Sequence, residues 1–236
     1  MVNSHSEIHL NIYKIIVLII LFKEQFLVDN FITLTIIGPG SNISILSSKY
    51  NTFPHSLYIN DSPIEPSKQI DLVKEGENIV KLKWNTKLKT AYQMFYGCTS
   101  LISADLSNFD ITGLTKSNGI AYIFDSCPSL KYVNLSGLRS ILLTSLYGIL
   151  SGCISLTSID ITNVYFPKLD SLRLTFQNCA SLISLDLSIL NDVLIDRIEY
   201  LFSGDSYLIL LDLSTNTIIP VNGYRGNEFT NCNKLK

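Results

Sequence analysis

The second half of the chain repeats one pattern of about 26 residues, and this repetition limits the folds that the chain can adopt. Each copy carries a phenylalanine or leucine, an anchor residue three positions later, then a leucine and a stretch such as Leu185-Asp-Leu-Ser188. The anchors lie 29, 26, 26, 26 and 27 residues apart, at Cys98, Cys127, Cys153, Cys179, Asp205 and Cys232. One unit cannot bury its own apolar side, but stacked copies can. We therefore expect an array at residues 91–236, with about five repeats plus a truncated sixth.

Each repeat combines two hydrophobic patterns. Leu182-Ile-Ser-Leu185-Asp-Leu187 fits the L-x-x-L-x-L core of a leucine-rich repeat, and its alternation is typical of a strand with one buried face. Ahead of the anchor, Ala91, Met94 and Phe95 have the i, i+3, i+4 spacing of a short helix or helical turn. Later repeats keep this spacing. The two patterns predict an α/β fold, a leucine-rich-repeat solenoid with a parallel strand ladder on one side and short helical turns on the other.

The chain before the repeats divides into two further segments. Residues 31–90 contain short alternating runs separated by Gly, Pro and Asn, which predict a small β-rich module that caps the array. Val80, Leu82 and Trp84 should face one way there and Lys81 and Lys83 the other. Residues 1–30 hold an eight-residue apolar core, residues 15–22, which fits either a signal peptide or a buried strand or helix and is too short to span a bilayer.

The cysteines admit three interpretations: a disulfide framework, a metal site or simple packing. The count of five is odd, and spacings near 26 residues are far from those of a zinc site. Asp205 also replaces the cysteine at one anchor position, and no other change in the sequence makes up for the lost cysteine. Packing of a small apolar thiol at the end of each helical turn is therefore the favoured interpretation, and no cofactor or metal is expected.

The strand stretches carry a second recurring feature, a polar residue between two buried ones. Asp186 should point away from Leu185 and Leu187, next to Ser184 and Ser188. Stacking would align such residues into an acidic, hydroxyl-rich surface, in which neighbouring carboxylates raise one another's pKa. Either serine-to-aspartate hydrogen bonds along the ladder or ligand binding would explain this polar surface. The candidate binding residues are Ser103, Asp105, Ser107, Tyr132, Asn134, Ser158, Asp160, Thr162, Ser184, Asp186, Ser188, Asp212 and Ser214.

The motif F-x-x-C-x-S-L-x-x-L-D-L-S resembles the BspA-like leucine-rich-repeat surface proteins of bacteria, mycoplasmas and protists. The resemblance covers about residues 91–236, with Asp205 in place of one cysteine and Asn134 in place of one aspartate. It implies display at the cell surface or outside the cell, adhesion or recognition of a protein or glycan partner there, and no enzyme activity. An intracellular leucine-rich-repeat scaffold in the cytoplasm is the alternative.

Composition and the lack of certain motifs argue against several classes of function. A net charge of −2 is unlike a nucleic-acid-binding surface, and no phosphate loop, nucleophile elbow or metalloprotease motif occurs. A local basic cluster is formed by Lys81, Lys83, Lys87 and Lys89, and we interpret it as a solvated face. Asn42, Asn60 and Asn134 are candidate glycosylation sites if the chain is secreted. Membrane association is expected only through the N-terminal segment or a C-terminal region missing from this sequence.

Overall fold

The structure is a computed structural model that describes residues 30–190, 193–212 and 227–235. The N-terminal apolar stretch at 15–22 and Ser214 lie outside the described residues. Among the described residues, no helix has the length and apolar character needed to cross a membrane.

Two long strands form the centre of the N-terminal region. Strand β1 (Asn30–Ser44) pairs antiparallel with β4 (Gln69–Trp84), and β4 pairs with β2 (Ser56–Ile59), which pairs with β3 (Ser62–Ile64). Alternate β1 side chains, including Ile32 and Leu34, are fully buried. The alternation in β4 is as expected, because Val80, Leu82 and Trp84 are buried and the lysines between them are not.

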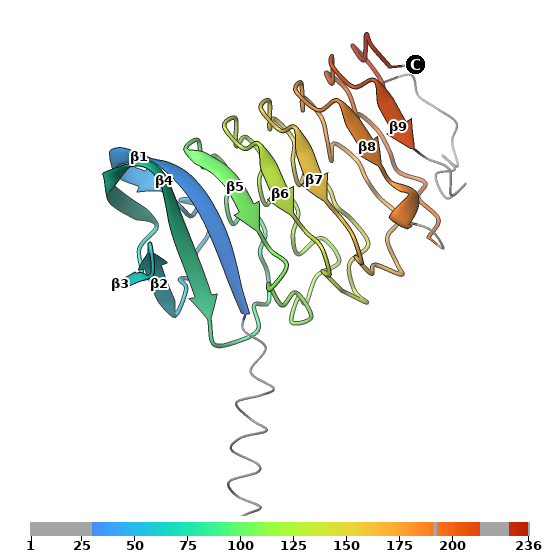
Figure 1. The fold of residues 1–236 in the computed structure, drawn as a ribbon. Helices are drawn as coiled ribbons and strands as arrows, with labels where there is room; N and C mark the ends of the chain where they lie inside the picture. The colour runs from blue at the N-terminus through green and yellow to red at the C-terminus, as the bar shows by residue number, and fades with distance from the viewer. Residues whose placement is uncertain (1–29, 191–192, 213–226, 236) are drawn as a thin grey trace, which may run out of the picture.

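Short strands, one per repeat, continue from this region. They are β5 (Leu101–Asp105), β6 (Tyr132–Asn134), β7 (Ser158–Asp160), β8 (Ser184–Asp186) and β9 (Leu210–Asp212). Strand β1 pairs antiparallel with β5, so β3-β2-β4-β1-β5-β6-β7 form one mixed sheet, while β8 and β9 form a separate parallel pair. The repeats lie one after another in an elongated array that extends from the N-terminal sheet (Figure 1).

The expected fold class, an α/β leucine-rich-repeat solenoid with short helical turns, is wrong. Nearly all the regular structure is sheet, and the only helix in the described residues is the three-residue 3-10 helix η1 (Ser188–Leu190). The sheet is also mixed, whereas the expected ladder was parallel throughout.

Chains of tight turns occupy the segments that were expected to be helical. In the first repeat Met94 N donates to Ala91 O and Cys98 N donates to Phe95 O, which are i to i+3 bonds. Gln93 and Gly97 have φ of 56° and 70°, the left-handed conformation that type II turns require and that a right-handed helix excludes. Gln93 N donates to Ala121 O in the next repeat, so backbone groups that a helix would pair internally join neighbouring repeats. The turns nevertheless bury the apolar side chains whose spacing suggested a helix.

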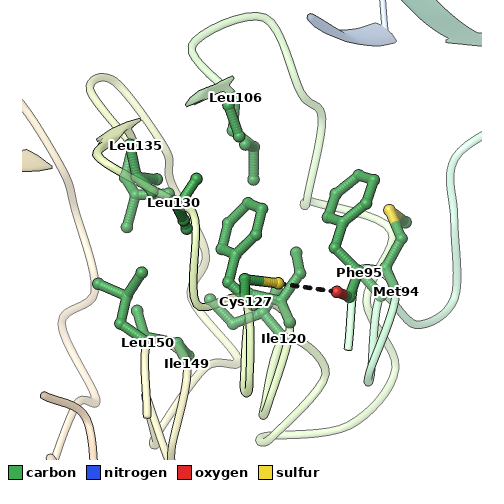
Figure 2. Close-up of a cluster of buried hydrophobic side chains, with 14 of the residues drawn as sticks. Met94, Phe95, Leu106, Ile120, Cys127, Leu130, Leu135, Ile149 and Leu150 are labelled. Atoms are coloured by element: carbon green, nitrogen blue, oxygen red, sulfur yellow. Dashed lines mark hydrogen bonds between the residues drawn. The ribbon is translucent and has the colours of Figure 1, made fainter. Parts of the chain in front are cut away.

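The core of the array contains stacked rings and buried thiols among leucine and isoleucine side chains, and Figure 2 shows the part around Phe95 and Cys127. The rings of Phe95 and Phe124 stack with centroids 5.2 Å apart. Phe176, Phe202 and Phe229 form a second stack, with separations of 5.5 Å and 5.7 Å. Leu150 takes the same position in the third repeat and therefore interrupts the column of stacked rings.

The anchor cysteines fill the spaces between repeats. All five thiols are unpaired; Cys98, Cys127, Cys153 and Cys179 are buried, and Cys232 is partly buried. The Cys127 thiol donates to the backbone carbonyl of Phe95 at 3.0 Å, and Cys153, Cys179 and Cys232 make the equivalent contact (Figure 2). In these four repeats the thiol therefore keeps a hydrogen-bond acceptor, which agrees with the packing interpretation.

Candidate functional site

The expected binding residues lie on the outward side of the repeat strands. We call this surface the strand face and define it by Ser103, Asp105, Ser107, Tyr132, Asn134, Ser158, Asp160, Thr162, Ser184, Asp186, Ser188 and Asp212. Asp105, Asn134 and Asp160 are register partners in neighbouring strands, as are Asp186 and Asp212. The structure thus brings these residues into one row across the array, with a break between β7 and β8.

Four acidic or amide side chains in the row also close a turn at the end of their own strand. Asp105 Oδ1 accepts from Ser107 N at 2.9 Å, and Asp160 Oδ1 accepts from Thr162 N at 2.8 Å. Asn134 makes the same contact with Ser136 N, and Asp186 makes it with Ser188 N. These bonds run within a repeat, whereas the expected serine-to-aspartate bonds ran between repeats. The contact needs only one side-chain oxygen, so Asn can replace Asp, and each aspartate keeps a second oxygen for a ligand.

At Asp186 the pKa shifts in the direction opposite to the one expected from mutual repulsion. Hydrogen bonds from the hydroxyl and the amide of Ser188 lower the pKa of Asp186, although the row was expected to raise it. Burial, assisted by the carboxylates of Asp160 and Asp105, raises the pKa of Tyr132, which lies between them on the same face. Near neutral pH the strand face therefore presents an ionised Asp186 on β8 and a neutral phenol at Tyr132 on β6.

The row continues into the N-terminal sheet, which sequence reasoning missed. Thr33 of β1 pairs with Asp105 and, on its other side, with Lys81 of β4. Thr35 accepts a hydrogen bond from the Ser103 hydroxyl at 2.8 Å. The charge along this surface thus changes from a lysine over β4 to carboxylates over the repeats, and the alternation in residues 31–37 was the signal that could have extended the site.

The strand face opens between the third and fourth repeats. Elsewhere adjacent strands are bonded: Ser158 N donates to Lys131 O, and Leu210 N donates to Ile183 O. No equivalent bond joins β7 to β8 in the described part of the chain, although the turn sides of these repeats stay bonded, for example through Gly148 N to Arg173 O. The split leaves a cleft of about 500 Å³. The lining includes six expected site residues, Ser158, Asp160, Thr162, Ser184, Asp186 and Ser188.

The floor of this cleft is apolar. Ile159, Ile161 and Leu185 line it, together with the more exposed Ile189, and none of them was among the expected site residues. Ile159 and Ile161 are only partly buried, whereas Val133 in the preceding strand is fully buried. A ligand group with an apolar stem and a polar or cationic end would match this floor and these walls.

The split coincides with the interruption of the ring column. Leu150 belongs to the third repeat, which contributes β7. A small apolar cavity of about 20 Å³ lies in the core there, lined in part by Ile149, Ile159 and Phe176. Leu150 itself does not line this cavity. We infer that the missing ring at its position weakens the packing between these two repeats on the strand side.

The strand face offers hydrogen-bond acceptors on an open surface, and its carboxylates have similar local contacts. Asp105, Asp160 and Asp186 all close equivalent turns, whereas acid–base catalysis requires carboxylates in contrasting environments. The described residues contain no group of three or more His, Cys, Asp or Glu that could hold a metal ion.

The three candidate glycosylation residues differ in exposure and in the hydrogen bonds that they make. Asn42 is exposed and its backbone amide donates to Asp71 at 2.8 Å. The Asn60 side chain is engaged at both ends, by Asn78 Oδ1 and by the amide of Ile79. Asn134 lies on the strand face, where its Oδ1 closes a turn.

Comparison with protein-family models, curated proteins and solved structures found no match to this chain. The resemblance to the BspA-like surface proteins therefore stays a prediction made from the repeat motif.

Proposed function

We propose that this protein is a non-catalytic recognition module that binds a protein partner through the strand face. The observation that carries the proposal is the cleft between β7 and β8, where Asp160 and Asp186 flank an apolar floor. In the described residues the other neighbouring strands of the face are hydrogen-bonded to each other, so we place the entry of a partner side chain at this cleft.

The chemistry of the cleft favours a partner with a basic side chain. The apolar floor suits the methylene stem of lysine or arginine, and the carboxylates accept hydrogen bonds from its charged end. The remaining hydroxyls, such as Ser158 and Ser184, provide additional donors and acceptors around it.

Photo-crosslinking on intact cells tests this proposal directly. A benzophenone amino acid would replace Ser184 in the cleft and, as the matched control, Lys168, an exposed residue outside the strand face. We expect a specific crosslinked protein from the Ser184 position that Asp160→Asn with Asp186→Asn abolishes. Identical crosslinks from both positions would contradict the proposal.

The cellular location is part of the same proposal. We infer an extracellular or cell-surface location from the repeat motif, with an intracellular scaffold as the alternative. Surface biotinylation of the native cell separates them, because only a displayed protein is labelled while cytoplasmic markers stay unlabelled.

A further inference from the structure

A second cleft lies where the N-terminal sheet meets the first repeats. Its volume is about 520 Å³, within the range of small-molecule sites. Lys49, Lys89 and Lys116 line it, together with Tyr50 and Tyr92. It shares no residue with the strand face.

Segments distant in sequence form this cleft and are fixed by hydrogen bonds. Lys49 follows β1, Lys89 follows β4, and Lys116 follows β5. The amide and hydroxyl of Thr115 donate to the backbone carbonyl of Lys89 at 3.1 Å and 3.3 Å, which holds the two lysine-bearing segments side by side. The Tyr50 hydroxyl donates to Thr90 O at 3.3 Å and ties the third segment to them.

Few negative charges lie near the lysines of the cleft. No carboxylate lines the cleft, and no ion pair is formed by Lys89 or Lys116 within the described residues. Lys49 is more engaged, since its ammonium lies 3.8 Å from the Tyr96 ring centre and its charge acts on Asp125.

Other groups in the cleft are neutral. Burial raises the pKa of Tyr50 to about 12, so its phenol adds no negative charge. Lys87, close in sequence to Lys89, lies 3.4 Å from the Asp110 carboxylate and does not line the cleft. The basic cluster expected at residues 81–89 is therefore divided by the fold, and only Lys89 joins the distant lysines.

We propose that this cleft binds a sulfate or phosphate ester carried on a sugar. The ammonium groups of Lys89 and Lys116 would hold the oxyanion as point charges, with Lys49 beside them. Thr52, Asn51 and Asn118 also line the cleft and supply donors and acceptors for sugar hydroxyls.

Tyr92 provides the surface for the sugar ring. Its side chain is 41% exposed, and its ring packs edge-on against Tyr122 with centroids 6.0 Å apart, so it is exposed and yet fixed.

Binding measured by titration calorimetry with two probes separates the sources of the ester. One probe is a heparin-derived tetrasaccharide with its desulfated counterpart, and the other is glucose 6-phosphate with glucose. We expect at least one charged probe to bind, with its uncharged counterpart at least tenfold weaker. The probe that binds more tightly identifies a sulfated or a phosphorylated sugar.

Matched variants assign the binding to this cleft. Lys89→Gln with Lys116→Gln should weaken the charged probe at least tenfold, while Lys89→Arg with Lys116→Arg should retain most of the affinity. Lys131→Gln with Lys168→Gln removes the same charge from exposed positions elsewhere and should leave the affinity unchanged. Failure of both charged probes to bind, or equal weakening by the two Gln pairs, would overturn the proposal. The crosslinking at Ser184 is unaffected by either result.

Discussion

The carboxyl group of Asp205 lies where the other repeats bury a thiol, with its Oδ1 atom 2.8 Å from the backbone amide of Cys179. The side chain is fully buried and its Oδ2 atom has no hydrogen-bond partner. Thiols at this position donate to a carbonyl of the preceding repeat, which a carboxylate cannot do and a carboxylic acid can. Burial raises the pKa of Asp205 to about 8, so the acid form fills the position at neutral pH.

Stability should therefore fall with rising pH through this one residue. The pKa of Asp205 is about 8 in the folded chain, against an ordinary value of about 3.9 in an unfolded one, so between these pH values only the folded chain holds the proton. The free energy of unfolding then decreases from about pH 4 to about pH 8 and is level above that. Urea unfolding at pH 5 and pH 8 measures the difference.

Asp205→Cys is the matched variant for this pH dependence. It restores the anchor residue of the other repeats and should raise the free energy of unfolding at pH 8 by roughly 3 kcal/mol, with a smaller gain at pH 5. An equal pH dependence in the variant and the parent protein would show that another group is responsible.

The split between β7 and β8 should be visible in amide hydrogen exchange. Ser158 N and Leu210 N are bonded to the preceding repeat, but Ser184 N, at the equivalent position, has no such bond. We expect the Ser184 amide to exchange at least tenfold faster than the other two, as measured by NMR. Equal protection of the three amides would mean that the strands are paired in solution.

Leu150→Phe tests whether the interrupted ring column causes the split. A phenyl ring there would complete the stack from Phe124 to Phe176 and should slow exchange of the Ser184 amide. The reverse change, Phe124→Leu, should destabilise the protein by about 1–2 kcal/mol. If Leu150→Phe lowers the free energy of unfolding by about 1–3 kcal/mol and leaves the exchange unchanged, the space at position 150 is already filled. The split between β7 and β8 would then have another cause.

The turn-closing role of the strand-face carboxylates predicts different effects for two substitutions at one position. Asp160→Asn keeps the oxygen that accepts from Thr162 N, as Asn134 does in the preceding repeat, and should leave stability nearly unchanged. Asp160→Ala removes the acceptor and should cost about 0.5–1.5 kcal/mol. Thermal unfolding of both variants measures this. Equal losses would mean that the charge, and not the turn, is what stabilises the fold.

The four buried anchor thiols, at Cys98, Cys127, Cys153 and Cys179, should be inert until the protein unfolds. Burial raises the pKa of Cys127 to about 12 and those of Cys98, Cys153 and Cys179 well above their usual value, so thiolate is scarce at pH 8. Ellman's reagent should react slowly with the native protein and with all five thiols after denaturation. Fewer than five reactive thiols in the denatured protein would indicate disulfides.

The sequence predicts the period of the repeats better than it predicts their backbone conformation. The period and the buried positions, such as Phe95 and Cys98, follow from the apolar spacing alone. That spacing does not distinguish a helix from a chain of turns, because both place residues i, i+3 and i+4 on one side. The left-handed residues decide the matter, and only some of them, such as Gly97, are glycines; Gln93 and Leu174 carry no such signal.

The candidate site was predictable in its composition and unpredictable in its shape. Outward placement of Asp160 and Asp186 follows from strand alternation. The cleft between them depends on how two repeats pack, and the one visible signal was Leu150 at a phenylalanine position. The lysine cleft depends on long-range contacts that join residues 49, 89 and 116, which no local pattern encodes.

The most direct test is the affinity of the partner captured by the Ser184 crosslink for two charge-matched pairs of variants. Asp160→Asn with Asp186→Asn neutralises the cleft and keeps both turns closed. Glu65→Gln with Glu75→Gln removes the same charge from exposed residues of the N-terminal region. We expect the cleft pair to weaken binding at least tenfold and the control pair to leave it unchanged. Equal affinity for both pairs, with the fold intact, would contradict recognition through the strand face.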